Sequence, residues 1–78
     1  MDDKSILQRI HALVESEHQL RHSASGLSSA DRRRLESIEH QLDQAWDLLR
    51  QRRAREELGE DPDSAKERTV DAVDGYLQ

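Results

Sequence analysis

The chain has 78 residues, of which 37% are charged and 33% apolar, and it carries a formal net charge of −5 at pH 7. A chain of this length suits one small domain and is too short for two. It contains no cysteine, which excludes a disulfide scaffold, a thiolate metal site and a thiol nucleophile. One proline and three glycines exclude a turn-rich β-barrel and leave little room for a phosphate-binding glycine loop.

The first residues and the apolar runs favour a cytoplasmic protein. The sequence begins MDDK, which lacks the basic and then apolar layout of a signal peptide. Apolar residues occur only in short runs, such as Ala12-Leu13-Val14, which cannot span a bilayer. The acidic net charge opposes binding to nucleic acid or to anionic lipid. We therefore expect neither a nucleic acid nor a membrane as partner.

The first predicted helix begins near Asp2 and is about 18 residues long, or roughly 27 Å. Its apolar residues recur at spacings of three and four, which indicates one helical face: Ile6, Leu7, Ile10, Leu13, Val14 and Leu20. Asp2, Asp3 and Ser5 are candidates for its N-cap and place negative charge at its N-terminus. Small residues over 23–26 predict a turn after it.

The second predicted helix follows Ser28 and is about 28 residues long, or roughly 42 Å. Ser28 and Asp31 resemble a capping box, and Gly59 suits the position just past a helix end. The apolar positions again have helical spacing: Leu35, Ile38, Leu42, Ala45, Trp46 and Leu49. Asp61 and Pro62 favour a short helix over 62–67. These patterns divide the chain into a hairpin at 1–59 and a tail at 60–78.

A short turn makes the two helices antiparallel neighbours. A turn centred near residue 25 places Leu13 beside Ile38, Ile10 beside Leu42, and Ile6 beside Ala45 or Trp46. Because two helices with one apolar stripe each cannot enclose a core, we expect a homodimer that forms a four-helix bundle, or a tail that folds back over the hairpin. The predicted interface comprises Ile6, Ile10, Leu42, Trp46, Leu49 and Arg53.

Polar residues within helical faces give the candidates for pairing and for metal binding. Glu17 falls inside the apolar arc of the first helix and needs a partner, for which Arg34 or, in a dimer, Arg53 is available. A weak metal site is an alternative use of the first helix, because Glu-x-x-His and His-x-x-x-His spacings can chelate. Its candidate ligands are Glu15, Glu17, His18 and His22.

The stretch RQRRAR at 50–55 is the sharpest local concentration of charge. Acidic residues follow at once, so Arg52 with Glu56 and Arg53 with Glu57 can form pairs four residues apart. Solvated pairing is the expected role of these arginines, with an acidic protein partner as the functional alternative. No nucleophile, base and orienting group occur at a recognised spacing, so we expect neither an enzyme nor a cofactor.

Three stretches carry a family resemblance: ILQRIHALVESEHQLR, LDQAWDLLRQRRA and the ending VDGYLQ. With them the chain resembles a family of short, uncharacterised actinobacterial proteins, classed as a domain of unknown function. The resemblance implies a bacterial cytoplasmic protein and no activity. The sequence therefore predicts an all-α antiparallel hairpin that acts as a small non-enzymatic interaction or oligomerisation module. A metal- or small-ligand-binding bundle is the alternative.

Overall fold

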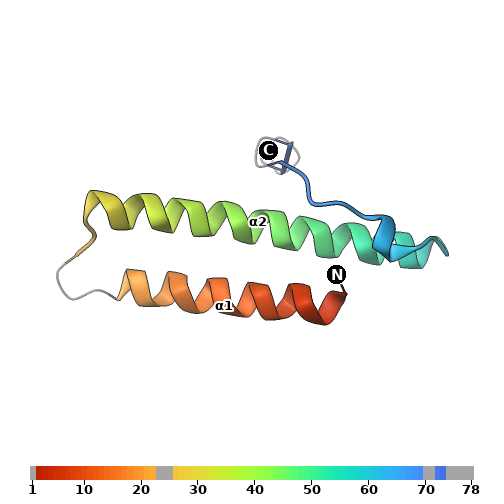
Figure 1. Cartoon of the computed structure of the whole chain (residues 1–78), viewed down its shortest axis with the longest axis horizontal. Helices are drawn as coiled ribbons and strands as arrows, with labels where there is room; N and C mark the ends of the chain where they lie inside the picture. Colours follow the sequence, from red (N-terminus) through yellow and green to blue (C-terminus); the bar gives the residue numbers. More distant parts are fainter. Residues whose placement is uncertain (1, 23–25, 70–71, 74–78) are drawn as a thin grey trace.

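The protein is an antiparallel pair of helices with a tail that returns along the longer one (Figure 1). The computed structural model describes residues 2–22, 26–69 and 72–73. Helix α1 spans Asp3–Arg21 and helix α2 spans Ser29–Glu57. A single turn of 3₁₀ helix, η1, spans Pro62–Ser64. The predicted all-α hairpin is confirmed, and both helix lengths agree with the apolar periodicity.

Side-chain caps fix where each helix begins. The Asp2 carboxylate accepts a hydrogen bond of 2.8 Å from the Ser5 backbone N–H, and the Ser28 hydroxyl accepts one of 3.1 Å from the Asp31 N–H. These bonds satisfy donors that have no partner inside the helix. The bond at Asp2 lowers the pKa of its carboxyl group. The predicted turn residues 23–25 lie outside the described part of the chain.

Gly59 ends α2 in the manner that its position in the sequence predicts. Its φ of 75° is in the left-handed region that favours glycine. The Gly59 N–H donates to the Glu56 carbonyl and the Glu60 N–H donates to the Arg55 carbonyl. This pair of bonds is a Schellman motif, which satisfies the last carbonyls of the helix and turns the chain back.

The helices pack through a small apolar cluster near the N-terminal end of α1: Ile6, Ile10, Ala45, Leu48 and Leu49. The predicted register places Ile6 beside Ala45 and Ile10 beside Leu42, and these four residues pack in or against this one cluster. The Asp3 carboxylate binds Arg52 at 2.6 Å, because the long arginine side chain leans back along α2 toward its N-terminus. Helix α2 extends past α1 at both ends (Figure 1).

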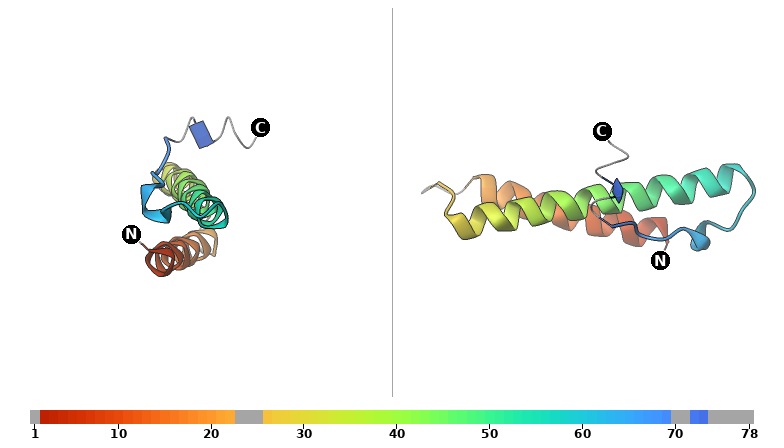
Figure 2. Two further views of the ribbon diagram at one scale, coloured as in Figure 1. Left: turned by 90° about the vertical axis from the view of Figure 1, so that its right-hand side faces the viewer. Right: turned by 90° about the horizontal axis from the view of Figure 1, so that it is seen from above.

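The tail turns back at Gly59 and runs beside α2, antiparallel to it (Figures 1 and 2). Where the sequence predicts a short helix over 62–67, the chain forms η1, with the Asp61 side chain accepting from the Asp63 N–H. After η1 the backbone is extended, and Ala65 packs against the hairpin core. The tail therefore covers one side of the hairpin.

Candidate functional site

Asp47 is the most deeply buried charged residue in the described part of the chain, with 1% of its surface exposed. It lies on the side of α2 that faces the tail. Its Oδ2 accepts hydrogen bonds of 2.9 Å from Gln51 Nε2 and from Arg68 Nε. Its Oδ1 accepts a second bond from the Arg68 guanidinium, which makes the ion pair bidentate. The carboxylate thus joins α2 to the tail.

The protonation of Asp47 reflects two opposing effects. Burial alone raises the pKa of a carboxyl group because it disfavours the charged form. The hydrogen bonds from Arg68 and Gln51 act in the other direction and outweigh burial, so the pKa of Asp47 lies below the ordinary value of 3.8. Asp47 is therefore a charged, fully paired group at neutral pH.

Two glutamines of α2 bind the backbone of the tail. Gln51 Nε2 donates to the Lys66 carbonyl at 2.8 Å, and Gln44 Nε2 donates to the Arg68 carbonyl at 3.2 Å. Because these bonds use main-chain acceptors, they hold an extended segment in place whatever its side chains are. Arg68 adds a side-chain contact that depends on the residue at its position.

Arg52 is the second buried charged residue, with 6% of its surface exposed. It donates to Asp3 at 2.6 Å and to Asp63 at 2.8 Å, so it joins the first turn of α1, α2 and η1. These two hydrogen bonds raise the pKa of the guanidinium group, and the bond from Arg52 lowers the pKa of Asp63.

The predicted pairing of the arginine stretch is wrong for Arg52, which binds Asp3 and Asp63 rather than Glu56. Within the described residues no ion pair joins Arg53 to Glu57, and Arg53 is exposed. Local spacing cannot identify Asp3, which lies far away in the sequence. In the sequence, only the acidic composition of the first helical turn and of the segment after Gly59 indicates that these segments could supply partners for Arg52.

Glu17 is half-buried, as its place in the apolar arc predicts, but the predicted pair with Arg34 does not form in the described part of the chain. Arg34 instead lines a surface hollow of about 420 Å³ near the hairpin turn, beside Ser16, Gln19, Leu20 and Asp31.

The candidate metal ligands do not form a site among the described residues. The His18 and His22 rings lie with their centroids 4.1 Å apart, and both residues are exposed. Glu15 is also exposed. Across residues 2–22, 26–69 and 72–73, no three histidine, aspartate or glutamate side chains are grouped so that they could hold a metal ion. The two histidines have no third ligand there.

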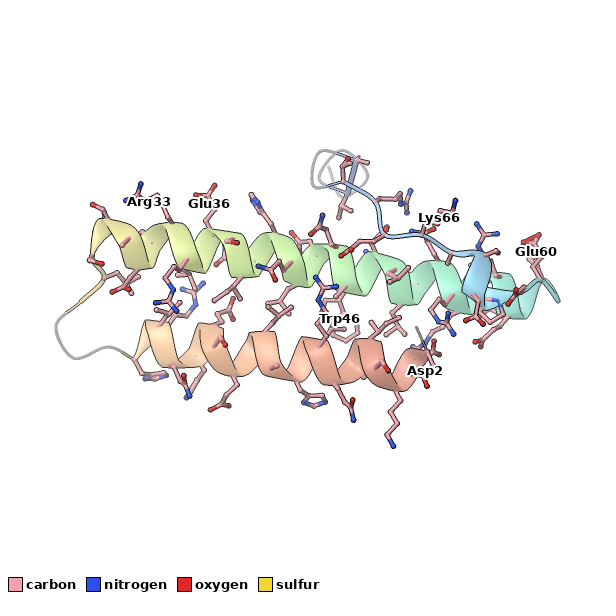
Figure 3. The ribbon with its side chains drawn as sticks, viewed as in Figure 1. Asp2, Arg33, Glu36, Trp46, Glu60 and Lys66 are labelled. Carbon is pink, nitrogen blue, oxygen red and sulfur yellow. The ribbon has the colours of Figure 1, made fainter. Side chains whose placement is uncertain are left out.

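The candidate interface residues separate into two groups. Ile6, Ile10 and Leu49 are buried inside the hairpin of a single chain, and Leu42 packs against the same core. Trp46 remains 42% exposed, and Arg53 is exposed as well. Trp46 projects from α2 toward the level of α1, whereas Arg33 and Glu36 project away from α1 (Figure 3). Of the six candidates, Trp46 and Arg53 are thus the ones available to a partner.

The fold and its two buried ion-pair clusters define a small all-α protein, a helical hairpin closed on one side by its own tail. Neither described helix contains a stretch that is long and apolar enough to span a bilayer. The chain belongs to the family described as "Protein of unknown function (DUF2630)", which matches residues 2–78. This confirms the resemblance to a domain of unknown function that the sequence motifs indicate.

The curated relatives come from mycobacteria. The uncharacterized protein Mb0922c of Mycobacterium bovis is 47% identical over 79 residues, which cover 95% of this chain and 88% of the relative. The uncharacterized proteins Rv0898c and MT0921.1 of two Mycobacterium tuberculosis strains match with the same identity and coverage. No solved structure matches significantly.

Proposed function

We propose that the protein is a non-enzymatic helical interaction module that acts in the cytoplasm and whose first partner is a second copy of itself. The exposed Trp46 is the observation that carries this proposal, because 42% of its surface faces solvent although few apolar side chains are buried in the described part of the chain. Tryptophan is strongly enriched at the centres of protein interfaces, where its large surface is shielded from water.

The size of the core supports association. The described residues contain few buried apolar side chains, and these come mainly from one layer between α1 and α2: Ile6, Ile10, Leu35, Ala45, Leu48, Leu49 and Val73. The tail covers one side of this layer, and among the described residues Val14, Trp46 and Leu58 are large apolar residues that stay exposed. Domains of this size commonly gain stability from oligomerisation.

The buried charges support a structural rather than a catalytic role. Asp47 is neutralised by Arg68, and Arg52 by Asp3 and Asp63. Each pair connects elements that are distant in the sequence, which is the use expected of ion pairs that hold a fold in register. The exposed Arg50 and Arg53 give the module a basic region that suits an acidic protein surface.

Sedimentation equilibrium of the full chain over a wide concentration range tests the proposal. We expect the weight-average mass to rise from that of the 9.0 kDa chain to twice that value as concentration increases. A mass that stays at 9.0 kDa up to millimolar concentration would contradict self-association. Adding Zn²⁺ in a parallel series tests the alternative, since a metal-dependent dimer would instead favour a ligand role for His18 and His22.

A further inference from the structure

Among the described residues, helix α2 makes most of its contacts through two of its three faces. One face packs on α1 through Ala45 and Leu49. A second binds the tail through Gln44, Asp47 and Gln51. On an α-helix these two sets of positions leave a third face on the side away from the tail, which carries the following residues: Glu39, Asp43, Trp46, Arg50 and Arg53. We call these five residues the Trp46 stripe.

The Trp46 stripe has the spacing of a helix-packing seam. Its members recur at intervals of four, three, four and three residues, which is the pattern that keeps one line of side chains facing a partner helix. Among the described residues, the side chains of Asp43, Arg50 and Arg53 make no hydrogen bond or ion pair, and the tryptophan at the centre is 42% exposed. The charge of Arg50 also acts on the nearby Asp47 carboxylate and helps to lower its pKa. Glu39 pairs with Arg21 at 2.7 Å in a contact that is open to solvent.

The charged residues of the stripe lie at similar distances on the two sides of its tryptophan, with the acidic ones before it and the basic ones after it. Glu39 lies seven residues before Trp46 and Arg53 lies seven residues after it. Asp43 and Arg50 lie three residues before and four residues after it. A stripe with this arrangement is complementary to its own reversed copy, because each acidic position meets a basic one when two such helices pack antiparallel.

We propose that two copies of this chain associate through the Trp46 stripe, with their α2 helices antiparallel and a two-fold axis at Trp46. This inference rests on the proposed function and specifies the surface and the orientation that it uses. Trp46 then packs against Trp46 of the second copy. Glu39 meets Arg53 and Asp43 meets Arg50 across the axis, each pair occurring twice. The two hairpins together form a four-helix bundle whose outer sides carry the tails.

The same charges exclude the other ways of pairing two α2 helices. In a parallel pair, Glu39 would face Glu39 and Arg53 would face Arg53, and like charges at such positions disfavour the wrong orientation. An antiparallel pair on the tail face would have to displace the contacts of Asp47 with Arg68. On the Trp46 stripe, a second copy displaces no ion pair or side-chain hydrogen bond of Asp43 or Arg53 among the described residues. Arg50 lies at the edge of the stripe, near Asp47, and can serve both that carboxylate and Asp43 of the second copy without losing a hydrogen bond.

Charge reversal tests the orientation directly. We expect Arg53→Glu and Glu39→Arg each to weaken self-association about tenfold or more, since each places two like-charged pairs across the axis. Mixing these two variants should restore association as a heterodimer, because both contacts between positions 39 and 53 then join an acidic side chain to a basic one. The doubly substituted chain should also dimerise for the same reason.

Two controls separate a surface effect from loss of the fold. Arg33→Glu makes the same charge change on the side of α2 that projects away from α1 (Figure 3), and we expect it to leave the dimer unchanged. The series Asp43→Arg and Arg50→Glu repeats the test without removing the Arg21 ion pair that Glu39 makes. Helical circular dichroism should match that of the unsubstituted chain in Arg53→Glu, because Arg53 is exposed.

The outcomes are distinguishable. A native chain that is monomeric throughout contradicts both the self-association in the proposed function and this inference. A native dimer that is unaffected by Arg53→Glu and by Asp43→Arg contradicts this inference alone and places the interface on another face. Single variants that dissociate but recover neither on mixing nor in the double variant overturn the antiparallel pairing.

Discussion

Replacing Asp47 by asparagine should release the tail from α2. The carboxylate is 1% exposed and accepts two hydrogen bonds from Arg68 and one from Gln51. Asparagine keeps the shape of the side chain but loses the charge and one acceptor. Hydrogen bonds to charged groups each contribute about 1.5–3 kcal/mol, and the partial exposure of Arg68 places the total near the low end, so we expect a loss of about 2 kcal/mol at pH 7.

The pH dependence identifies the cause of that loss. The pKa of Asp47 is lowered in the folded chain, so its contribution is complete above the ordinary value of 3.8 and is lost as pH falls through the folded pKa. The stability difference between the native chain and Asp47→Asn should therefore be largest near pH 7 and should shrink as the pH falls below 3.8.

Two assays measure the effect of Asp47→Asn. Urea unfolding at pH 7 and pH 2 gives the difference in free energy of unfolding. Limited trypsin cleavage after Lys66 reports the tail alone, and about 2 kcal/mol corresponds to a roughly 25-fold faster cut if cleavage follows the open population. Glu36→Gln is the control, because it removes a charge from an exposed position of α2. Equal stability of Asp47→Asn and the native chain at pH 7, or a difference that persists unchanged at pH 2, would refute the reasoning.

Three further substitutions or additions test other parts of the structure. Arg52→Met should lower the melting temperature by about 5–10 °C, whereas the same change at the exposed Arg33 should have little effect; equal effects would show that Arg52 does not tie η1 to α1. Gly59→Ala should cost about 1 kcal/mol in thermal unfolding, since φ is 75° there, and an unchanged melting temperature would contradict the Schellman turn. Titration calorimetry with Zn²⁺ should show no stoichiometric binding, and tight binding abolished by His18→Gln would revive the metal-binding alternative.

Local signals in the sequence predict most of the fold. The apolar spacing, the caps at Asp2 and Ser28 and the glycine at position 59 determine where the helices begin and end, and each acts within a few residues. The register that places Ile6 beside Ala45 and Ile10 beside Leu42 follows from the same signals, because the apolar stripes of the two helices must meet, and these residues pack together in the structure.

The ion pairs that hold the tail cannot be predicted from local spacing, because their partners are far apart in the sequence. The rule for residues three and four apart assigns Arg52 to Glu56, but a buried guanidinium gains more from Asp3 and Asp63, which reach it only after the chain has folded. Asp47 lies outside the apolar stripe, and nothing near it in the sequence indicates burial. The sequence does single out Trp46, whereas its partial exposure is evident only from the structure.

Trp46 itself offers the most direct test of self-association, because it is the one tryptophan in the chain and its fluorescence reports a single site. Its accessibility to a collisional quencher such as acrylamide can be measured from submicromolar to millimolar protein. We expect quenching to fall as concentration rises, in step with the increase in mass, and we expect Arg53→Glu to shift the transition to higher concentration. Quenching that stays constant while the mass doubles would show that the second copy binds elsewhere on the surface. Constant quenching at constant mass would contradict the proposed self-association.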